Sequence, residues 1–299
     1  MLAGTVNGQP VYWLMDTGST ASFIVRPAAE RLGLDIQGMS GDVEFSGIGG
    51  DGIRVGQTTL RHLTLGSWSR DDTAVMVANA HDLGRKDVIG LLGEPFFSDF
   101  DVELDYAHSQ VILLKAVNCD DETWLAYWDK DAVDVPLDRS PAWNERVVVD
   151  VKVNGLLIQA MLDTGASTSA LSFEGAQRAG LHIGDTGVNM TGPTGGLGAH
   201  AMHTYVGTLD SFAIGGETIK HAKLEFIDMH KWDPKLVRGS GYDYRLPQFD
   251  MLLGIDFLRV HRLLISHSQH RLYFSYIGDG KAFFGVTRPS QPAESPSAP

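Results

Sequence analysis

Cysteine is nearly absent from the sequence. Cys119 is the only one, so no disulfide can form within the chain. A single thiol fits either a reducing compartment or a core that needs no covalent cross-link. Long apolar runs are missing as well: none approaches the roughly 20 residues needed to cross a bilayer, so we expect no membrane span. The N-terminus also lacks the basic and apolar regions of a secretory signal.

Basic residues are scarce. There are 24 Lys and Arg against 37 Asp and Glu, which gives a net charge of −13. Nucleic acids and anionic membranes are bound by clustered Lys and Arg, so we expect no nucleic-acid partner. The acidity either weakly favours basic peptide substrates or serves only solubility, and we prefer solubility.

What the sequence does contain is an internal repeat. Asp16-Thr17-Gly18 returns 147 positions later as Asp163-Thr164-Gly165. The flanking segments keep the same offset: Val6-Asn7-Gly8 with Val153-Asn154-Gly155, and Gly33-Leu34 with Gly180-Leu181. One Asp-Thr-Gly is commonly a plain turn after a strand. Two copies in register with their neighbours indicate a duplicated unit.

A second paired signal follows each motif. Val88–Gly93 leads into Phe96-Phe97, and Met251–Gly254 leads into Phe257-Leu258. The offset is now 161, so the second half has gained 14 residues. Most of this gain can lie in the polar and aromatic stretch 228–250. Whether that insert regulates access to a site is left open.

Alternating apolar residues bounded by Gly and Asp recur along the chain, and they predict a mainly β protein. Short helices are expected at 26–34 and 173–181, each ending near a glycine suited to a C-cap. Polar residues with interspersed aromatics at 115–131 indicate a connection between the halves. The Pro, Ser and Ala residues near the C-terminus show no core-forming pattern.

The paired motifs resemble those of the retropepsin-like aspartic proteases, specifically bacterial forms with both lobes in one chain. The resemblance covers 4–114 and 133–284 and implies a mainly β fold of two pseudo-two-fold-related lobes with short helices. We therefore divide the chain into segments: an N-terminal lobe at 1–117, a linker at 118–132, a C-terminal lobe at 133–288 and a disordered tail at 289–299.

Peptide hydrolysis without a metal needs one group that takes a proton from water and another that gives one to the carbonyl oxygen. Two close carboxyls can do both, because both cannot easily be ionised at the same time and they therefore share one proton. Asp16 and Asp163 are therefore the expected catalytic residues of an aspartic endopeptidase. The resemblance assigns scaffold roles to the residues that follow them: Thr17, Gly18, Thr164 and Gly165.

Two glycine-rich stretches occupy equivalent places in the halves. The resemblance implies flaps that close over substrate and contact it through Ile48, Gly49, Gly50, Gly196, Leu197 and Gly198. An ordinary glycine hairpin is the alternative. Gly47–Gly52 also matches the dinucleotide-binding pattern G-x-G-x-x-G, but the strand-like residues 53–58 follow it where that pattern requires a helix.

Eleven histidines raise the question of a metal site. No His-Glu-x-x-His motif occurs, and His200 and His203 fall in a strand-like segment where residues three apart face opposite sides. The cluster of His261, His267 and His270 has no metal-ligand spacing that we recognise. We expect no metal and no cofactor.

The expected partner is a polypeptide substrate. No obligatory homodimer is expected, because both aspartates lie in one chain. The alternative is a catalytically silent peptide-binding or scaffold protein on the same fold. Glu94-Pro95 and the 228–250 insert depart from the family pattern, and the insert puts access to the site in doubt.

The second half has a lead-in of strand and loop that the first half lacks. We therefore expect that Met1 begins a trimmed chain. The compartment is open: periplasmic or otherwise exported if an export signal was removed, and cytoplasmic if not.

Overall fold

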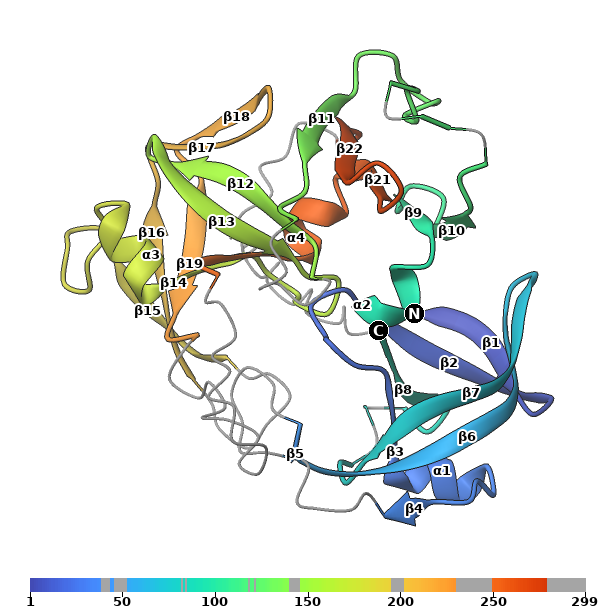
Figure 1. Ribbon diagram of the computed structural model, residues 1–299. Helices are drawn as coiled ribbons and strands as arrows, with labels where there is room; N and C mark the ends of the chain where they lie inside the picture. Colours follow the sequence, from blue (N-terminus) through green and yellow to red (C-terminus); the bar gives the residue numbers. More distant parts are fainter. Residues whose placement is uncertain are drawn as a thin grey trace, which may run out of the picture.

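The computed structural model describes residues 1–38, 44–45, 53–81, 83, 85–117, 119–120, 122–139, 146–194, 202–229 and 249–278. These residues form three β-sheets with short helices (Figure 1). The mainly β architecture predicted from the sequence is confirmed. Within the described part of the chain, none of the helices is long and apolar enough to cross a bilayer.

The first lobe is built on an eight-stranded sheet with the path β1-β2-β8-β3-β7-β6-β4, and β5 pairs with β6. A further pairing between β1 and β6 closes the sheet on itself. Its strands are β1 (Leu2–Val6), β2 (Gln9–Asp16), β3 (Phe23–Val25), β4 (Gln37–Gly38), β5 (Glu44–Phe45), β6 (Ile53–Leu65), β7 (Trp68–Ala78) and β8 (Val88–Gly93). Its helices are α1 (Arg26–Arg31) and α2 (Glu94–Phe97).

The second lobe is built on a nine-stranded sheet with the order β15-β16-β19-β14-β20-β13-β12-β17-β18. Its strands are β12 (Val148–Val153), β13 (Leu156–Leu162), β14 (Ala170–Ser172), β15 (Asn189–Thr194), β16 (Met202–Thr208), β17 (Ser211–Ile214), β18 (Glu217–Lys220), β19 (Lys223–Ile227) and β20 (Met251–Leu253). Its helices are α3 (Phe173–Arg178) and α4 (Ile255–Leu258).

A five-stranded sheet, here called the interlobe sheet, combines strands that follow each lobe with one strand that precedes the second. Its order is β10-β9-β21-β22-β11. The strands are β9 (Asp101–Asp105), β10 (Gln110–Leu114), β11 (Val133–Pro136), β21 (His261–Ser266) and β22 (Arg271–Tyr276). The antiparallel pairing of β9 with β21 joins the two halves of the chain.

The two lobes repeat the same strand pairings. β2 pairs in parallel with β8, as β13 does with β20, and β3 and β14 lie next in each sheet. The hairpins that lead into both Asp-Thr-Gly motifs share a turn: Asn7 and Gly8 have φ of 51° and 82°, and Asn154 and Gly155 have 50° and 80°. Asn-Gly favours this doubly left-handed turn, which fixes strand register.

Both expected helices form, and each is three residues shorter than predicted. α1 ends at Arg31 and α3 at Arg178. Gly33 and Gly180 follow with positive φ, as expected for glycine C-caps. Pro95 does not prevent α2 from forming, because it lies in the first turn, where a helix needs no N–H donor.

One apolar cluster runs through both lobes and the interlobe sheet. Phe97 of α2 and Leu258 of α4, which are equivalent at the offset of 161, are both fully buried in it. Burial of side chains this large contributes about 1.5–3 kcal/mol each. The linker aromatics pack on the interlobe sheet: Trp124 lies edge-on to Tyr273, with ring centroids 5.1 Å apart.

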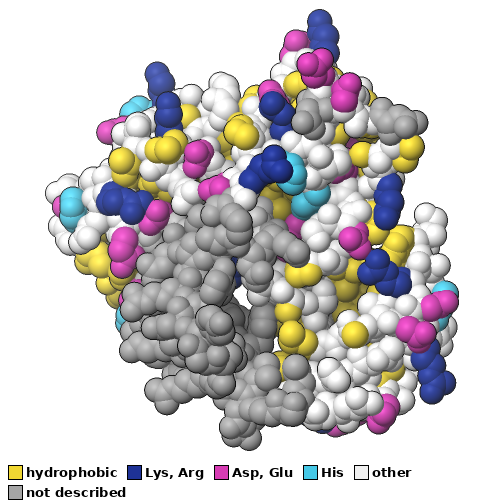
Figure 2. Space-filling model, viewed as in Figure 1, with side chains coloured by type: hydrophobic (Ala, Val, Ile, Leu, Met, Phe, Trp, Pro, Cys, Tyr) yellow, Lys and Arg dark blue, Asp and Glu magenta, His cyan; other side chains and the backbone are white. Residues whose placement is uncertain are grey.

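Charged side chains of both signs are interspersed over the described surface of both lobes on the visible face (Figure 2). On this face the Lys and Arg side chains of the described residues lie scattered rather than gathered into one patch.

Candidate active site

Each Asp-Thr-Gly motif lies at the end of a strand that is held on both sides. Asp16 ends β2, where it pairs with Gly93 of β8. Asp163 directly follows β13, and its N–H donates to the Leu253 carbonyl of β20 at 2.9 Å. In both lobes the neighbouring strand is almost wholly buried, so the backbone that carries each aspartate is fixed by the core.

The two threonines tie the motifs together in a reciprocal way. The Thr17 hydroxyl donates to the Leu162 carbonyl at 2.8 Å and accepts from the Thr164 N–H at 3.1 Å. The Thr164 hydroxyl donates to the Met15 carbonyl at 2.8 Å and accepts from the Thr17 N–H at 3.1 Å. Thr17 is fully buried, so the two bonds of its hydroxyl satisfy a group that water does not reach.

The two glycines place each carboxyl against the opposite lobe. A Cβ on Gly18 would lie 2.6 Å from Cγ of Asp163, and one on Gly165 would lie 2.7 Å from Cγ of Asp16. Only glycine leaves room for the carboxyls here. Each glycine N–H also donates to the aspartate of its own motif, Gly18 to Asp16 at 3.1 Å and Gly165 to Asp163 at 2.8 Å.

The two carboxyls perturb each other's ionisation. The pKa of Asp16 is raised from 3.8 to about 7, mainly by burial and also by the negative charge of Asp163 and a hydrogen bond with it. Burial also raises the pKa of Asp163, although N–H donors and the hydrogen bond with Asp16 oppose that rise. Such a pair holds one proton more firmly than either acid would alone.

The pair is not symmetric. Asp163 is buried and accepts a second N–H, from Ala166 at 3.1 Å, whereas Asp16 is half-buried. The positive charge of Arg146 further lowers the pKa of Asp163. The Arg146 guanidinium lies 5.9 Å from the ring centroid of Phe249, which is buried beside the second motif's strand. The deeper burial of Asp163 favours its protonated form. The charge of Arg146 opposes this, and the hydrogen bond between the carboxyls lowers the pKa of Asp163 while raising that of Asp16, so these two effects favour a carboxylate at Asp163 and a proton on Asp16.

Two serines support the loops behind the carboxyls. Ser22 accepts from the Gly93 N–H at 3.0 Å, and Ser169 accepts from the Gly254 N–H at 2.9 Å. The sequence analysis missed this pair, although the offset from Ser22 to Ser169 is again 147. Arg146 was also missed, and no repeat signal marks it.

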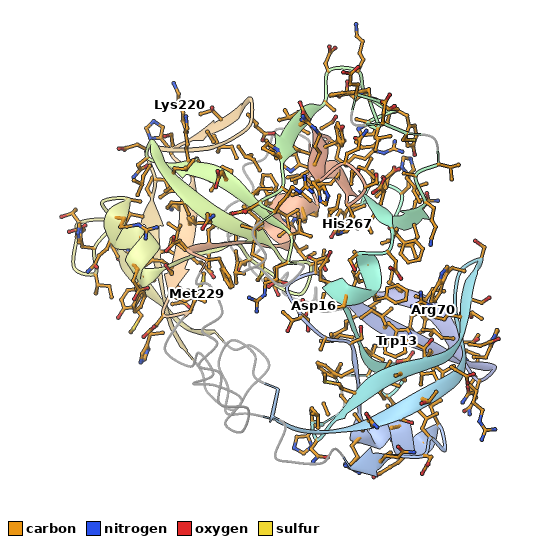
Figure 3. All side chains as sticks on the ribbon, viewed as in Figure 1. Trp13, Asp16, Arg70, Lys220, Met229 and His267 are labelled. Carbon is orange, nitrogen blue, oxygen red and sulfur yellow. The ribbon has the colours of Figure 1, made fainter. Side chains whose placement is uncertain are left out.

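A buried ion pair connects the first loop to the interlobe sheet. The Glu94 N–H donates to the Ser19 carbonyl at 2.9 Å, and the Glu94 carboxylate accepts from His267 at 2.6 Å. Figure 3 shows His267 between Asp16 and the strands of the interlobe sheet. Glu94-Pro95 departs from the family pattern, but it does not distort the start of α2. Glu94 instead makes structural contacts with Ser19 and His267.

The expected flap residues Ile48, Gly49, Gly50, Gly196, Leu197 and Gly198 lie outside the described residues, as does most of the 228–250 insert. Of the histidines considered as metal ligands, His200 also lies outside the described residues, and His270 occupies the turn between β21 and β22. Among the described residues, no three His, Cys, Asp or Glu side chains gather as a metal site requires.

The match to a known protein family occurs twice, once in each half of the duplicated chain. The chain matches a family model described as aspartyl protease over residues 2–96 and again over 149–257, together more than half of its length. A search of curated proteins finds no match.

Solved structures similar to this chain include a retropepsin-like aspartic protease from Rickettsia conorii, at 21% identity and a TM-score of 0.33, covering 48% of this chain and 99% of that one. Another is EIAV protease in complex with the inhibitor HBY-793, at 23% identity and a TM-score of 0.27, covering 38% and 86%. On the strength of the family match, the chain belongs to the aspartyl protease family.

Proposed function

We propose that the chain is an aspartic endopeptidase in which Asp16 and Asp163 form one catalytic dyad at the junction of the lobes. The observation that carries the proposal is reciprocal: each carboxyl packs against the glycine of the other motif. Neither lobe alone would supply two carboxyls. Family membership supports peptidase activity, and the raised pKa values support a shared proton.

The asymmetry of the pair assigns a role to each residue. A water molecule between the carboxyls loses a proton to the Asp163 carboxylate as its oxygen attacks the peptide carbonyl carbon. Protonated Asp16 donates to the carbonyl oxygen, which gives a neutral tetrahedral diol. Return of the proton from Asp163 to the nitrogen then allows the C–N bond to break. As this bond breaks, one hydroxyl of the diol returns its proton to Asp16, so the products are a carboxylic acid and an amine and the dyad regains its single proton.

The scaffold residues act by holding these groups still. Thr17 and Thr164 fix the two loops relative to each other, and Gly18 and Gly165 orient the carboxyls. We propose that the stretches around Gly49 and Leu197 act as flaps, and that one chain forms a complete site without a homodimer. A catalytically silent peptide-binding protein remains the alternative function.

The test uses purified protein and a diverse peptide mixture, with cleavage followed by mass spectrometry. Asp16→Asn and Asp163→Asn should each reduce the rate by at least 10²–10⁴-fold, since each removes one proton-transfer partner. Unchanged circular dichroism would show that the fold survives. More than a tenth of the wild-type rate in either variant would contradict the dyad, and absence of cleavage by the wild type would favour the silent alternative.

Oligomeric state is tested separately by dilution. Activity per molecule should stay constant through the nanomolar range, whereas a site shared between two chains would be lost by mass action. Loss on dilution, with a mass near twice 32.5 kDa in light scattering, would show that the lobes pair between chains.

A further inference from the structure

The loop that carries Asp16 is held against the first turn of α2. The Ser19 carbonyl accepts from the Glu94 N–H at 2.9 Å. A Cβ on Gly93 would lie 2.7 Å from the same carbonyl and 2.4 Å from that of Ala21, so the loop packs directly on this turn. A backbone hydrogen bond from Ser19 in turn lowers the pKa of the Asp16 carboxyl. The position of Glu94 therefore bears on Asp16 through a single intervening residue.

The loop of Asp163 has the same backbone contact and a further one. The Ile255 N–H donates to the Ala166 carbonyl at 2.8 Å, which repeats the contact in the first lobe. The Asp256 carboxyl accepts from the N–H and the hydroxyl of Ser169 at 2.8 and 2.6 Å. The far end of this loop is therefore fastened to α4 by a side chain.

The first lobe lacks this fastening. At the offset of 161, Pro95 stands where the second lobe has Asp256, and a proline side chain accepts no hydrogen bond. Ser22, the counterpart of Ser169, therefore finds no equivalent acceptor at this position of α2. The first loop depends on a different side chain for its support.

Glu94 supplies that side chain. It is fully buried, and its carboxylate accepts from Nε2 of His267 at 2.6 Å. Nδ1 of the same ring donates to the Phe100 carbonyl at 2.6 Å. The second lobe has Ile255 at the place of Glu94, and the counterpart of His267 at the offset of 161 is Tyr106. The charged pair is thus specific to the loop of the first lobe.

The ring of His267 is held from more than one side. It borders a cavity that Asp99, Asp101 and Lys115 also line. Asp101 accepts from the N–H and the hydroxyl of Ser268 at 2.9 and 2.7 Å, which holds the next residue of the turn in place. A cation fixed in this way can anchor the carboxylate opposite it.

We propose that Glu94 and His267 are positioning residues for Asp16. Their ion pair fixes the first turn of α2, that turn fixes the carbonyl of Ser19, and Ser19 holds the carboxyl that donates a proton to the substrate. This role rests on the proposed function, in which Asp16 is the proton donor. In the first lobe the pair takes the place of the fastening that Asp256 provides in the second.

The main test removes the cation and keeps a hydrogen-bond donor. In His267→Gln the Glu94 carboxylate loses its counter-charge, so the turn should shift and Ser19 should move away from Asp16. At pH 6, kcat per folded molecule should fall about tenfold or more while KM stays within about twofold, since neither residue is expected to touch the substrate. The pKa of Asp16, followed by carbon-13 NMR of its carboxyl, should rise because the bond from Ser19 that lowers it is lost.

His261→Gln is the matched control. His261 is also fully buried, with Nε2 3.1 Å from Glu217 and Nδ1 2.8 Å from the Phe257 carbonyl oxygen. These contacts do not involve the Asp16 loop. The control should lose stability, whereas kcat of the folded protein and the pKa of Asp16 should remain those of the wild type.

Two further variants keep the test decisive if His267→Gln does not fold. Glu94→Ile combined with His267→Tyr places the residues of the second lobe at both positions and removes both charges of the pair. This double variant should show the same loss of kcat and the same rise in the pKa of Asp16. Adding Pro95→Asp gives Ser22 the acceptor that the second lobe provides, so the triple variant should recover most of the lost rate.

The NMR titration separates this role from the function on which it rests. If the wild type cleaves no peptide, an Asp16 pKa that rises in His267→Gln but not in His261→Gln would still show that the pair holds this carboxyl. An Asp16 pKa that stays at its wild-type value in the folded variant, or that changes equally in the control, would overturn the proposal. So would a rise in KM with kcat unchanged, or a triple variant no better than the double.

Discussion

The Glu94 carboxylate lies 2.6 Å from Nε2 of His267, across the boundary between α2 and the turn of the β21–β22 hairpin. Nδ1 of the same ring lies 2.6 Å from the Phe100 carbonyl oxygen. Both acceptors lack protons, so both ring nitrogens must donate, and the histidine is held as an imidazolium. A single residue change can therefore leave a fully buried Glu94 carboxylate without its cation.

We first predict a pH-dependent loss of stability at this ion pair. Burial alone would lower the pKa of His267, but the hydrogen bond and charge of Glu94, the Phe100 carbonyl and the charge of Asp101 together raise it above 6.5. The pair's contribution is then fully present below about pH 6.5 and is lost as pH rises through the folded-state pKa. Urea unfolding of the wild type from pH 5 to 9 should show this decline.

The matching variant is His267→Gln, which should destabilise the protein by about 3–5 kcal/mol at pH 6 because it leaves a buried charge uncompensated. Its stability should depend less on pH in this range. His62→Gln is the control, since the pair of His62 with Asp71 is exposed and such pairs contribute at most about 1 kcal/mol. Equal losses in the two variants would contradict the role assigned to burial.

Our second prediction concerns the threonine contacts. Thr17→Ala leaves the Leu162 carbonyl and the Thr164 N–H without their partner and should cost roughly 2–4 kcal/mol. Thr17→Ser keeps the hydroxyl and should recover most of this stability and the peptidase rate. Chemical denaturation and peptide cleavage check the two effects. A Ser variant as impaired as the Ala variant would show that the methyl group, not the hydroxyl, matters.

The third prediction separates the shape of the site from the stability of the fold. Gly165→Ala places a methyl group 2.7 Å from Cγ of Asp16, so the carboxyl must move, and the peptidase rate should fall at least 10²-fold. Gly216→Ala has open space around its new methyl group and should leave both rate and stability unchanged. A Gly165→Ala enzyme with near-normal activity would show that the carboxyls are not constrained as described.

Arg146 provides a fourth prediction, on the pH–rate profile. Its positive charge lowers the pKa of Asp163, so Arg146→Met should raise that pKa and move the acidic limb of kcat/KM to higher pH. Arg146→Lys retains the charge and should keep the limb near its wild-type position. If the Lys and Met variants shift the limb equally, the guanidinium acts through packing on Phe249 rather than through its charge.

The sequence predicted those features that repeat. The offset of 147 located both aspartates and their threonines, and the Asn-Gly turns and glycine C-caps followed from local backbone preferences. Local rules suffice for these features because the residues that decide them are neighbours in the chain. The short apolar segments before α2 and α4 were recognisable for the same reason.

Contacts between distant residues could not be predicted in this way. The segment Val102–Asp105 alternates apolar and acidic residues, which is typical of a strand with one solvent-exposed face, yet Glu103 is fully buried. Its carboxylate accepts from Arg262 at 2.6 Å and from the Tyr127 hydroxyl at 2.8 Å, and Arg262 lies 159 residues away. The periodicity of β9 gives no sign that the side chains on both of its faces are buried.

Our last prediction tests the shared proton without measuring catalysis. The pKa of Asp16 is about 7 in the folded protein and 3.8 for an unperturbed side chain. Between these values the folded state binds more protons than the unfolded state, so wild-type stability should fall as pH rises from about 4 to about 7, by up to a few kcal/mol. Asp16→Asn carries no charge at this position, so it should lose much of this slope and be more stable than the wild type at pH 8. Asp35→Asn, at an exposed carboxyl, is the control and should follow the wild-type curve. Urea unfolding across this pH range decides the matter, because an Asp16→Asn curve parallel to the wild type would mean that Asp16 ionises as freely in the folded protein as in the unfolded chain.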